Sequence, residues 1–322
     1  MARGALDRAR DLAAQALGVS AAEITFVSSG TEAVNLALFG TKGPLLTWAA
    51  EHQSVLGAAR RMQTLARAVS IGGVDGTGVV DLDAIGRGTS VVSVGLANNE
   101  IGTIQPVAEV IQRAHDVGAL VHVDACAGPR WVSIPPGADL VSFSGHKLGA
   151  GSGGALFVRE GVRIEPLLFG GPQEWGRRAG REDLAAAIAV ATALSVCGRL
   201  RAARSGAARR QRDVLLDAMR QLGGKITGAT ARLPNLASCT FDGRRGEDML
   251  LALDLAGVAA SSGSACASGS LDPSHVLLAI GLTLDQALGS LRLSTGYETT
   301  DEEISRAVAI LRSVLTRAAA RA

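Results

Sequence analysis

Lysine is scarce in this chain: Lys42, Lys147 and Lys225 are the only lysines among 32 basic residues. Chemistry that needs an amine nucleophile therefore has three candidate residues. Aromatic residues make up only 3% of the chain and the net charge is only +2, with acidic and basic side chains interspersed. We therefore expect no nucleic-acid binding. The hydrophobic content of 47% excludes a disordered chain.

Cysteines and long apolar runs are also few. Four cysteines occur, with neither a CxxC pair nor metal-ligand spacing among them: Cys126, Cys197, Cys239 and Cys266. We expect no metal site and no disulfide framework, and we interpret at least three of the four as small core residues. The longest apolar run, residues 184–197, is shorter than the roughly 20 residues that span a bilayer. No signal peptide is evident at the N-terminus, so we expect a cytoplasmic protein without membrane contact.

Short β-branched runs alternate with amphipathic stretches in the first half of the chain. The expected strands are Ile24–Val27, Leu45–Thr47, Ala68–Ile71, Ser90–Val94, Leu120–Val123, Leu140–Phe143 and Ala155–Val158. The expected helices are Ala5–Leu17, Thr31–Phe39, His52–Leu65 and Pro106–Val117. This alternation predicts an α/β fold with a mostly parallel sheet flanked by helices, and catalytic groups at the strand ends.

The pattern changes after residue 184, where long helices dominate. We expect two consecutive helices, two short strands and a terminal helix: Leu184–Arg204, a second ending at Leu222, Ala237–Phe241, Val258–Ala260, and a helix from Glu302. The sequence thus predicts a large domain over residues 1–195 and a smaller C-terminal α+β domain over residues 196–322.

Three polar groups at strand ends together suit pyridoxal phosphate. A Ser-Ser-Gly-Thr segment ending at Gly30 and Thr31 precedes a helix, where backbone N–H groups favour a phosphate, although a simple N-cap is the alternative. Asp124 ends an apolar strand and could hold a protonated ring nitrogen, or only cap a turn. Lys147 directly follows another strand, and its amine could form a Schiff base. Their combination predicts this cofactor.

Other side chains could also carry chemistry. His52 opens a helix after a strand and could stack on a planar cofactor, although a lone histidine is more often structural. Cys266 lies among small residues that leave its thiol accessible, or it is a small core residue. Arg292 lies in a strand-like run and could clamp a substrate carboxylate. His122 and Asp124 share a strand face and could suit a non-haem iron site, which a parallel α/β scaffold disfavours.

Seven segments follow the order of motifs in one known family. They lie at residues 26–35, 51–55, 97–106, 122–125, 144–147, 261–266 and 290–294. Through them the chain resembles the cysteine desulfurases, class-V aminotransferase relatives with the fold type I of pyridoxal-phosphate enzymes. The resemblance implies a homodimer that converts L-cysteine to L-alanine. It also implies that the sulfur is held as a persulfide on Cys266 and passed to a protein acceptor, in iron–sulfur cluster assembly or thiolation.

The same resemblance implies a role for each candidate residue. Lys147 would hold the cofactor and take the substrate Cα proton, His52 would stack on the ring, and Cys266 would attack the substrate sulfur. The cofactor would also contact Gly30, Thr31, Asn99, Asp124, Ser144 and His146. Asn99 and Arg292 would bind the substrate, with Arg292 on its carboxylate.

The chain departs from the family pattern at several places. Ala127 replaces a glutamine that bonds to the cofactor's phenolic oxygen, and Arg181 replaces a threonine that reaches the phosphate in the partner subunit. The glycine-rich turn 149–154 is shorter than the family's turn, and we expect the family's N-terminal segment to be absent. Two alternatives therefore stay open. The chain could be a divergent paralogue that acts as a persulfide carrier or interaction partner, or another class-V aminotransferase or lyase, such as a selenocysteine lyase.

Overall fold

The structure is a computed structural model that describes residues 2–263 and 273–319. The chain divides into two units. Unit 1 contains Met1–Gly73, Val80–Ala97 and Gln105–Arg201, and unit 2 contains Val74–Val79, Asn98–Ile104 and Ala202–Ala322. The last boundary follows Arg201, a few residues after the position expected from the sequence. Two short segments from the first half of the chain also belong to unit 2, which local sequence patterns do not reveal.

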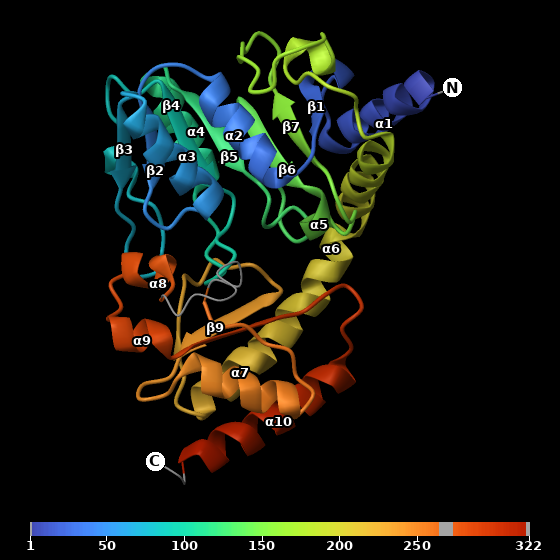
Figure 1. Cartoon of the computed structure of the whole chain (residues 1–322). Helices are drawn as coiled ribbons and strands as arrows, with labels where there is room; N and C mark the ends of the chain where they lie inside the picture. Colours follow the sequence, from blue (N-terminus) through green and yellow to red (C-terminus); the bar gives the residue numbers. More distant parts are fainter. Residues whose placement is uncertain (1, 264–272, 320–322) are drawn as a thin grey trace. The chain divides into compact units, whose positions relative to one another are not determined.

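Unit 1 is built on a seven-stranded sheet with strand order β1-β7-β6-β5-β4-β2-β3 (Figure 1). Its strands are β1 (Ile24–Val27), β2 (Leu45–Trp48), β3 (Val69–Gly72), β4 (Val91–Gly95), β5 (Leu120–Asp124), β6 (Leu140–Ser144) and β7 (Gly154–Val158). Neighbouring strands from β3 to β6 pair in parallel, whereas β7 is antiparallel to both β6 and β1. The mostly parallel sheet predicted from the sequence is confirmed, and each expected strand is present.

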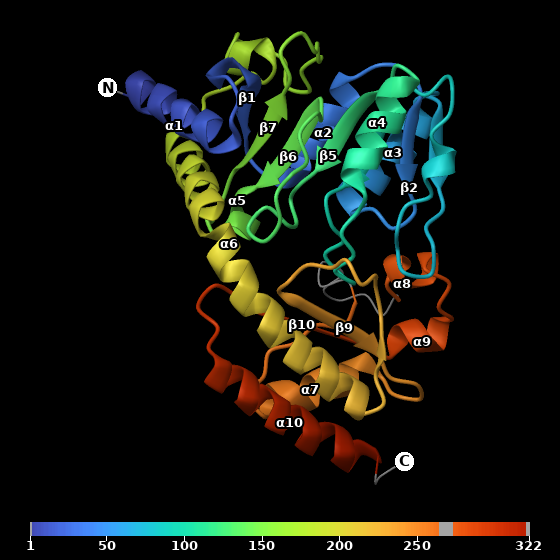
Figure 2. The same ribbon diagram turned by 180° about the vertical axis from the view of Figure 1, so that it is seen from behind.

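Helices cover both faces of this sheet. They are α1 (Ala2–Leu17), α2 (Gly30–Gly40), α3 (Gln53–Thr64), α4 (Val107–Asp116) and α5 (Gly145–Leu148), with short 3-10 turns at Ala21–Glu23, Leu82–Ala84 and Glu174–Gly176. Figures 1 and 2 show α2 and α3 on one face and α4 on the other. On the first face, Leu38 and Met62 pack against Leu45 and Val91 of the strands. Burying such apolar side chains stabilises the layered arrangement.

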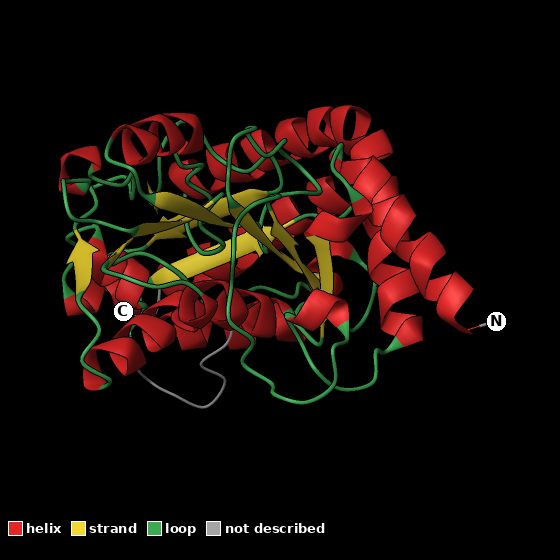
Figure 3. Ribbon diagram, turned by 90° about the horizontal axis from the view of Figure 1, so that it is seen from above, coloured by secondary structure: helices red, strands yellow, loops and turns green. Residues whose placement is uncertain are grey.

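Unit 2 has a three-stranded antiparallel sheet with the order β10-β9-β8. Its elements are β8 (Lys225–Ile226), β9 (Leu236–Thr240), α7 (Gly246–Leu255), α8 (His275–Ala279), α9 (Leu284–Leu288), β10 (Ser290–Ser294) and α10 (Asp301–Ala319). Helices and strands are coloured separately in Figure 3. The strand expected at Val258–Ala260 is wrong, because in that stretch only the adjacent Ser261 forms an isolated bridge, to Arg292.

The long helix α6 (Leu184–Gln221) is continuous over 38 residues, so the expectation of two helices is wrong. Gly206 in its interior costs only about 1 kcal/mol relative to alanine, and burial of residues such as Ala191 and Leu215 offsets this cost. Among the described residues, α6 is the one helix long and apolar enough to cross a membrane, by length and composition only. Buried Ala187, Val190 and Ala191 are also typical of a core helix.

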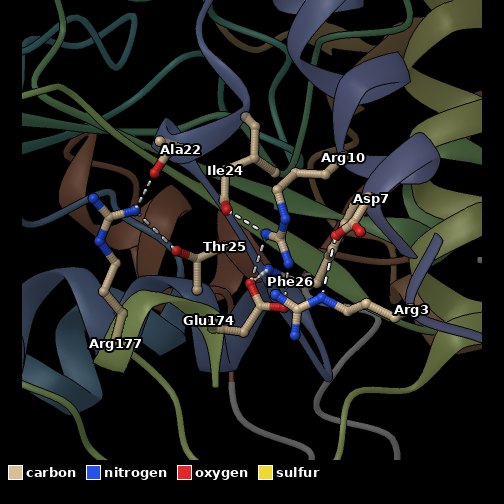
Figure 4. A network of polar contacts seen from close by, with 9 residues as sticks. All are labelled: Arg3, Asp7, Arg10, Ala22, Ile24, Thr25, Phe26, Glu174 and Arg177. Atoms are coloured by element: carbon tan, nitrogen blue, oxygen red, sulfur yellow. Dashed lines mark hydrogen bonds and ion pairs between the residues drawn. The ribbon is translucent and has the colours of Figure 1, made fainter. Parts of the chain in front are cut away.

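A buried ion pair fastens α1 to the segment that follows β7 (Figure 4). The guanidinium of Arg10 makes two hydrogen bonds to the Glu174 carboxylate, at 2.8 and 2.7 Å, and both residues are buried. Glu174 also accepts a hydrogen bond from the Phe26 N–H at 2.8 Å. These contacts hold Glu174 and Trp175 in left-handed backbone conformations, with φ of +49° and +60°, which side chains other than glycine adopt at some cost.

We expect Arg10→Ala to destabilise the protein by about 3–5 kcal/mol, because it leaves the Glu174 carboxylate buried without its cation. Arg3→Ala on the same helix is the matched control, since the Arg3–Asp7 pair is exposed and exposed pairs contribute about 0–1 kcal/mol. Urea unfolding followed by circular dichroism gives both values. Equal losses for the two variants would contradict a structural role for the buried pair.

Candidate active site

The candidate site lies at one edge of the unit 1 sheet. Because β1, β2, β4, β5 and β6 point in the same direction, the residues that follow them meet at their carboxyl edge. The residues that follow or end these strands are Gly30, Glu51, His52, Gly95, Asp124, Ser144 and Lys147. The strand order thus gathers most of the cofactor residues expected from the sequence into one region.

The predicted phosphate loop packs directly on this edge. Helix α2 begins at Gly30 after the N-cap Ser29, whose hydroxyl accepts a hydrogen bond from the Glu32 N–H at 3.1 Å. A Cβ atom on Gly30 would lie 2.5 Å from Cys126 Sγ and 2.8 Å from Ser144 Cβ, so only glycine fits. The start of the helix therefore presents its first backbone N–H groups beside the ends of β5 and β6, as an anion site requires.

Asp124 places a buried carboxylate at the end of β5. Its side chain is 6% exposed, and Oδ1 accepts a hydrogen bond from the Cys126 N–H at 2.9 Å. Its carbonyl oxygen accepts another from the Leu96 N–H at 2.9 Å, which ties it to the chain after β4. A carboxylate held in this way offers a fixed negative charge to a cation such as a protonated ring nitrogen.

Lys147 lies on α5, immediately after β6, and is half-buried. Burial, and then the charge of Lys147, lower the pKa of His146. Burial and then the charge of Asp124 raise the pKa of the Cys126 thiol, and the charge of Lys147 opposes this rise. The amine therefore lies within electrostatic reach of both residues. Ser144 Oγ and His146 Nδ1, also expected to hold the phosphate, are hydrogen-bonded at 2.9 Å.

The three lysines of the chain differ sharply in their surroundings. Lys42 forms an ion pair with Glu165 and Lys225 forms one with Asp242, all four side chains being exposed. Lys147 has no hydrogen-bond or ion-pair partner among the described residues. Of the three lysines, Lys147 is therefore the one whose amine is not held by a surface carboxylate.

His52 is the N-cap of α3, as expected. Its Nδ1 accepts a hydrogen bond from the Ser54 N–H at 3.1 Å and lies 2.8 Å from Ser54 Oγ. The ring is thus oriented by the helix that it caps. It lies at the end of β2, on the same edge as Asp124.

The predicted substrate residues Asn99 and Arg292 meet within unit 2. Arg292 Nη1 donates hydrogen bonds to the carbonyl oxygens of Asn99 at 2.9 Å and Gly263 at 3.3 Å. Asn99 lies in a turn where Asn98 Oδ1 accepts hydrogen bonds from the N–H groups of Glu100 and Ile101. The Cys266 prediction lies outside the described residues.

The iron alternative for His122 and Asp124 is not supported by the geometry. His122 is fully buried, and its two ring nitrogens lie 2.9 Å from Ser93 Oγ and 2.7 Å from Ser142 Oγ. Burial lowers its pKa to about 4, so the ring is neutral and joins β4, β5 and β6. No group of three or more potential metal ligands occurs among the described residues.

Two residues at this edge were missed by the sequence analysis. Cys126 is not a core residue like Cys197 and Cys239; it is half-buried and lies against Gly30. Glu51 is 6% exposed at the end of β2. Its position directly before His52 could have marked Glu51 as a site residue. An acidic residue in a turn is ordinarily exposed, however, so its burial was not expected.

Two of the departures from the family pattern, Arg181 and the turn that contains Gly153, lie near the phosphate loop. Arg178 forms an ion pair with Glu32 of α2 at 3.0 Å. Arg178 and Arg181 line a pocket that also contains Ser28 and Gly153. The glycine-rich turn after α5 begins with Gly149 at φ +93°, a left-handed helix end that glycine adopts without strain.

Known proteins resemble this chain along nearly its whole length. The family model described as Aminotransferase class-V matches residues 1–307. Cysteine desulfurase IscS 1 of Archaeoglobus fulgidus is 37% identical, over 98% of this chain and 87% of the relative. A solved structure described as a NifS-like protein has a TM-score of 0.90 at 30% identity, covering 98% of this chain and 88% of its own. Another, SspA in complex with cysteine, has a TM-score of 0.80 at 26% identity, covering 93% and 88%.

Proposed function

The chain belongs to the class-V aminotransferase family and is a cysteine desulfurase within it, and we propose how its residues divide the work. Unit 1 binds pyridoxal phosphate, and unit 2 carries the sulfur-accepting Cys266 together with Asn99 and Arg292 for the substrate, L-cysteine. The observation that carries this proposal is that half-buried Lys147 and the buried carboxylate Asp124 both act on the same thiol, Cys126, at the carboxyl edge of the unit 1 sheet.

The residues at the unit 1 edge fit the cofactor. A Cβ atom at position 30 would clash with Cys126 and Ser144, so glycine is required at the start of the helix that would face the phosphate. Thr31 follows Gly30 in sequence, and Ser144 is hydrogen-bonded to His146. Asp124 supplies the charge for a ring nitrogen, and His52 supplies a flat ring at the same edge. When bound, pyridoxal phosphate supplies a carbonyl for the amine and a protonated ring that stores electrons from the substrate Cα.

The chain's own groups carry the proton and sulfur transfers. Lys147 would hold the cofactor through its amine and would take the proton from the substrate Cα. The Cys266 thiolate then attacks the substrate sulfur; an S–S bond forms, the substrate C–S bond breaks, and the carbon is reduced while the sulfur is oxidised. Cysteine and one enzyme thiol thus become alanine and one enzyme persulfide. The persulfide sulfur passes to a thiol of an acceptor protein.

Arg292 orients the substrate in this proposal. Its guanidinium is already held by the carbonyl oxygens of Asn99 and Gly263 through Nη1. A guanidinium fixed in this way can meet a carboxylate with paired hydrogen bonds. Gly263 lies three residues before Cys266 in the sequence. Arg292 is therefore hydrogen-bonded close in sequence to the proposed sulfur acceptor.

The surface of unit 1 supports the proposal of a homodimer. The segment between β7 and α6 exposes Phe169 (85%), Trp175 (55%) and Leu168 (46%). Large apolar side chains gathered in one exposed segment are typical of an interface. The resemblance assigns the neighbouring residues 178–181 to contacts with the partner subunit, which supports a second copy of the chain as the occupant.

We expect Lys147→Ala to lose the visible absorbance of bound pyridoxal phosphate and to release alanine from cysteine at least about 100-fold more slowly. Lys225→Ala, an exposed lysine of unit 2, is the matched control and keeps both properties. Absorbance spectra and an alanine assay in the same tube measure the two effects. Normal absorbance in the Lys147 variant would contradict its assignment as the cofactor lysine.

Cys266→Ala should keep the cofactor's absorbance but form no protein persulfide, with alanine release slowed by about 100-fold or more. Cys239→Ala, at a buried position on β9, controls for the loss of one thiol. Persulfide is measured by mass spectrometry after alkylation. Release of alanine and sulfide at the parent rate would assign the activity to a lyase that does not use this cysteine.

Light scattering should give about twice the chain mass of 32.8 kDa for the parent protein. Phe169→Arg should shift it to the monomer mass, because it places a charge in the apolar contact. Leu65→Arg, also exposed at 57% but after α3, should leave the dimer intact. A monomeric parent protein with cofactor bound would be inconsistent with the proposed assembly.

A further inference from the structure

Glu51 is a buried carboxyl to which the proposed reaction gives no role. It follows β2 and is 6% exposed. Its Oε1 accepts a hydrogen bond from the Gly95 N–H at 3.0 Å, and its Oε2 lies 3.0 Å from where a Cβ atom on Gly95 would stand. Both carboxyl oxygens therefore lie against the last residue of β4. Gly95 leaves room for them because it has no side chain.

This position brings Glu51 next to Asp124. Gly95 pairs directly with Asp124 in the parallel β4–β5 ladder, and Leu96 N–H donates to the Asp124 carbonyl at 2.9 Å. Two carboxyls, from the ends of β2 and β5, thus flank the end of β4. Both are almost fully removed from water. Two neighbouring buried carboxyls do not both ionise at neutral pH, because each charge opposes the other in a medium that screens poorly.

We propose that Glu51 is a positioning residue that holds a proton in the folded protein, so that the Glu51–Asp124 pair presents one negative charge, on Asp124, to the cofactor ring. The proposal rests on the proposed function only where it concerns the cofactor. The carboxyl pair itself is a property of the protein without cofactor.

The surrounding groups favour this distribution of charge. The pKa of Glu51 is raised to about 8, mainly by burial; the hydrogen bond from the Gly95 N–H opposes the rise, and the Asp124 charge contributes to it. From β5, His122 is neutral, because burial lowers its pKa to about 4. From the loop after β5, the Cys126 thiol is also neutral, since its pKa is raised well above the ordinary value. His52 adjoins Glu51 in sequence, and Lys147 and His146 follow β6, the strand on the far side of β5 from Glu51.

The pair predicts a link between cofactor binding and pH. A protonated ring nitrogen beside Asp124 compensates its charge, so the repulsion that raises the Glu51 pKa weakens. Cofactor binding should then lower the pKa of Glu51, while burial still keeps it above the ordinary value. Since binding favours the deprotonated form, the affinity for pyridoxal phosphate should rise as pH increases toward 8.

The decisive experiment is infrared spectroscopy of the apoprotein across pH 5–9. Carboxyls with ordinary pKa values near 4 are ionised above about pH 6, so a carboxylic acid C=O band at pH 7 reports a shifted group. We expect such a band with a midpoint near 8. It should vanish in Glu51→Gln and remain in Glu165→Gln, the matched control on the surface.

Asp124→Asn tests the pairing itself. Removing the neighbouring negative charge should lower the midpoint of the band by about 1 pH unit. A midpoint that does not move would show that burial alone protonates Glu51, and it would overturn the pair. A parent protein without the band at pH 7, or a band that survives in Glu51→Gln, would overturn the proposal as well.

Cofactor titration separates this inference from the proposed function. The parent affinity for pyridoxal phosphate should rise with pH by up to about tenfold for each unit that binding lowers the Glu51 midpoint. In Glu51→Gln the affinity for pyridoxal phosphate should lack this added dependence on pH. If the affinity of the two proteins changed equally with pH, Glu51 would not link cofactor binding to pH. If the parent binds no cofactor, the proposed function fails, while the infrared spectra still decide whether the carboxyl pair exists.

Discussion

The hydrogen-bond register of β4, β5 and β6 is the constraint on which the candidate site depends. Gly95 pairs with Asp124, and Asp124 pairs with Ser142, two residues before Ser144. A slip of one residue along β5 would turn the Asp124 side chain to the opposite face of the sheet. The buried His122 joins all three strands through Ser93 and Ser142. Its two hydrogen bonds therefore fix the register of these strands two residues before Asp124, at the edge that carries the candidate site.

Local patterns in the sequence predicted most of unit 1 because its strands are short apolar runs between turn residues. Asp124 and Lys147 were identifiable for the same reason, since a charged residue directly after a buried strand has few structural uses. Contacts between distant residues were not predictable. Arg10 and Glu174 lie 164 positions apart, and neither residue type suggests a buried pair. Similarly, nothing local indicates that Gly30 must lie against Cys126.

Unit 2 was predicted less well, for two physical reasons. Its short strands carry too few residues to show a period, so β8, with two residues, was missed and a strand was wrongly expected at Val258–Ala260. The continuity of α6 depends on burial on both sides of Gly206, and burial is a tertiary property. The segment 98–104, which carries Asn99, belongs to unit 2 although it directly follows a strand end of unit 1.

The two buried charged clusters of unit 1 differ in how fully their groups are paired. In the Arg10–Glu174 cluster, cation and carboxylate satisfy each other through two hydrogen bonds, and the result is a fixed backbone around Trp175. At the sheet edge, the Asp124 carboxylate bonds to the Cys126 N–H and to the Cys126 side chain, neither of which is a cation. Lys147 has no ion-pair partner among the described residues. Burying a charged group without a partner charge costs free energy that the folded protein by itself does not offset. A ligand with a cationic ring, an electrophilic carbon and a phosphate would provide a partner for the Asp124 carboxylate and for the Lys147 amine at the same edge of the sheet.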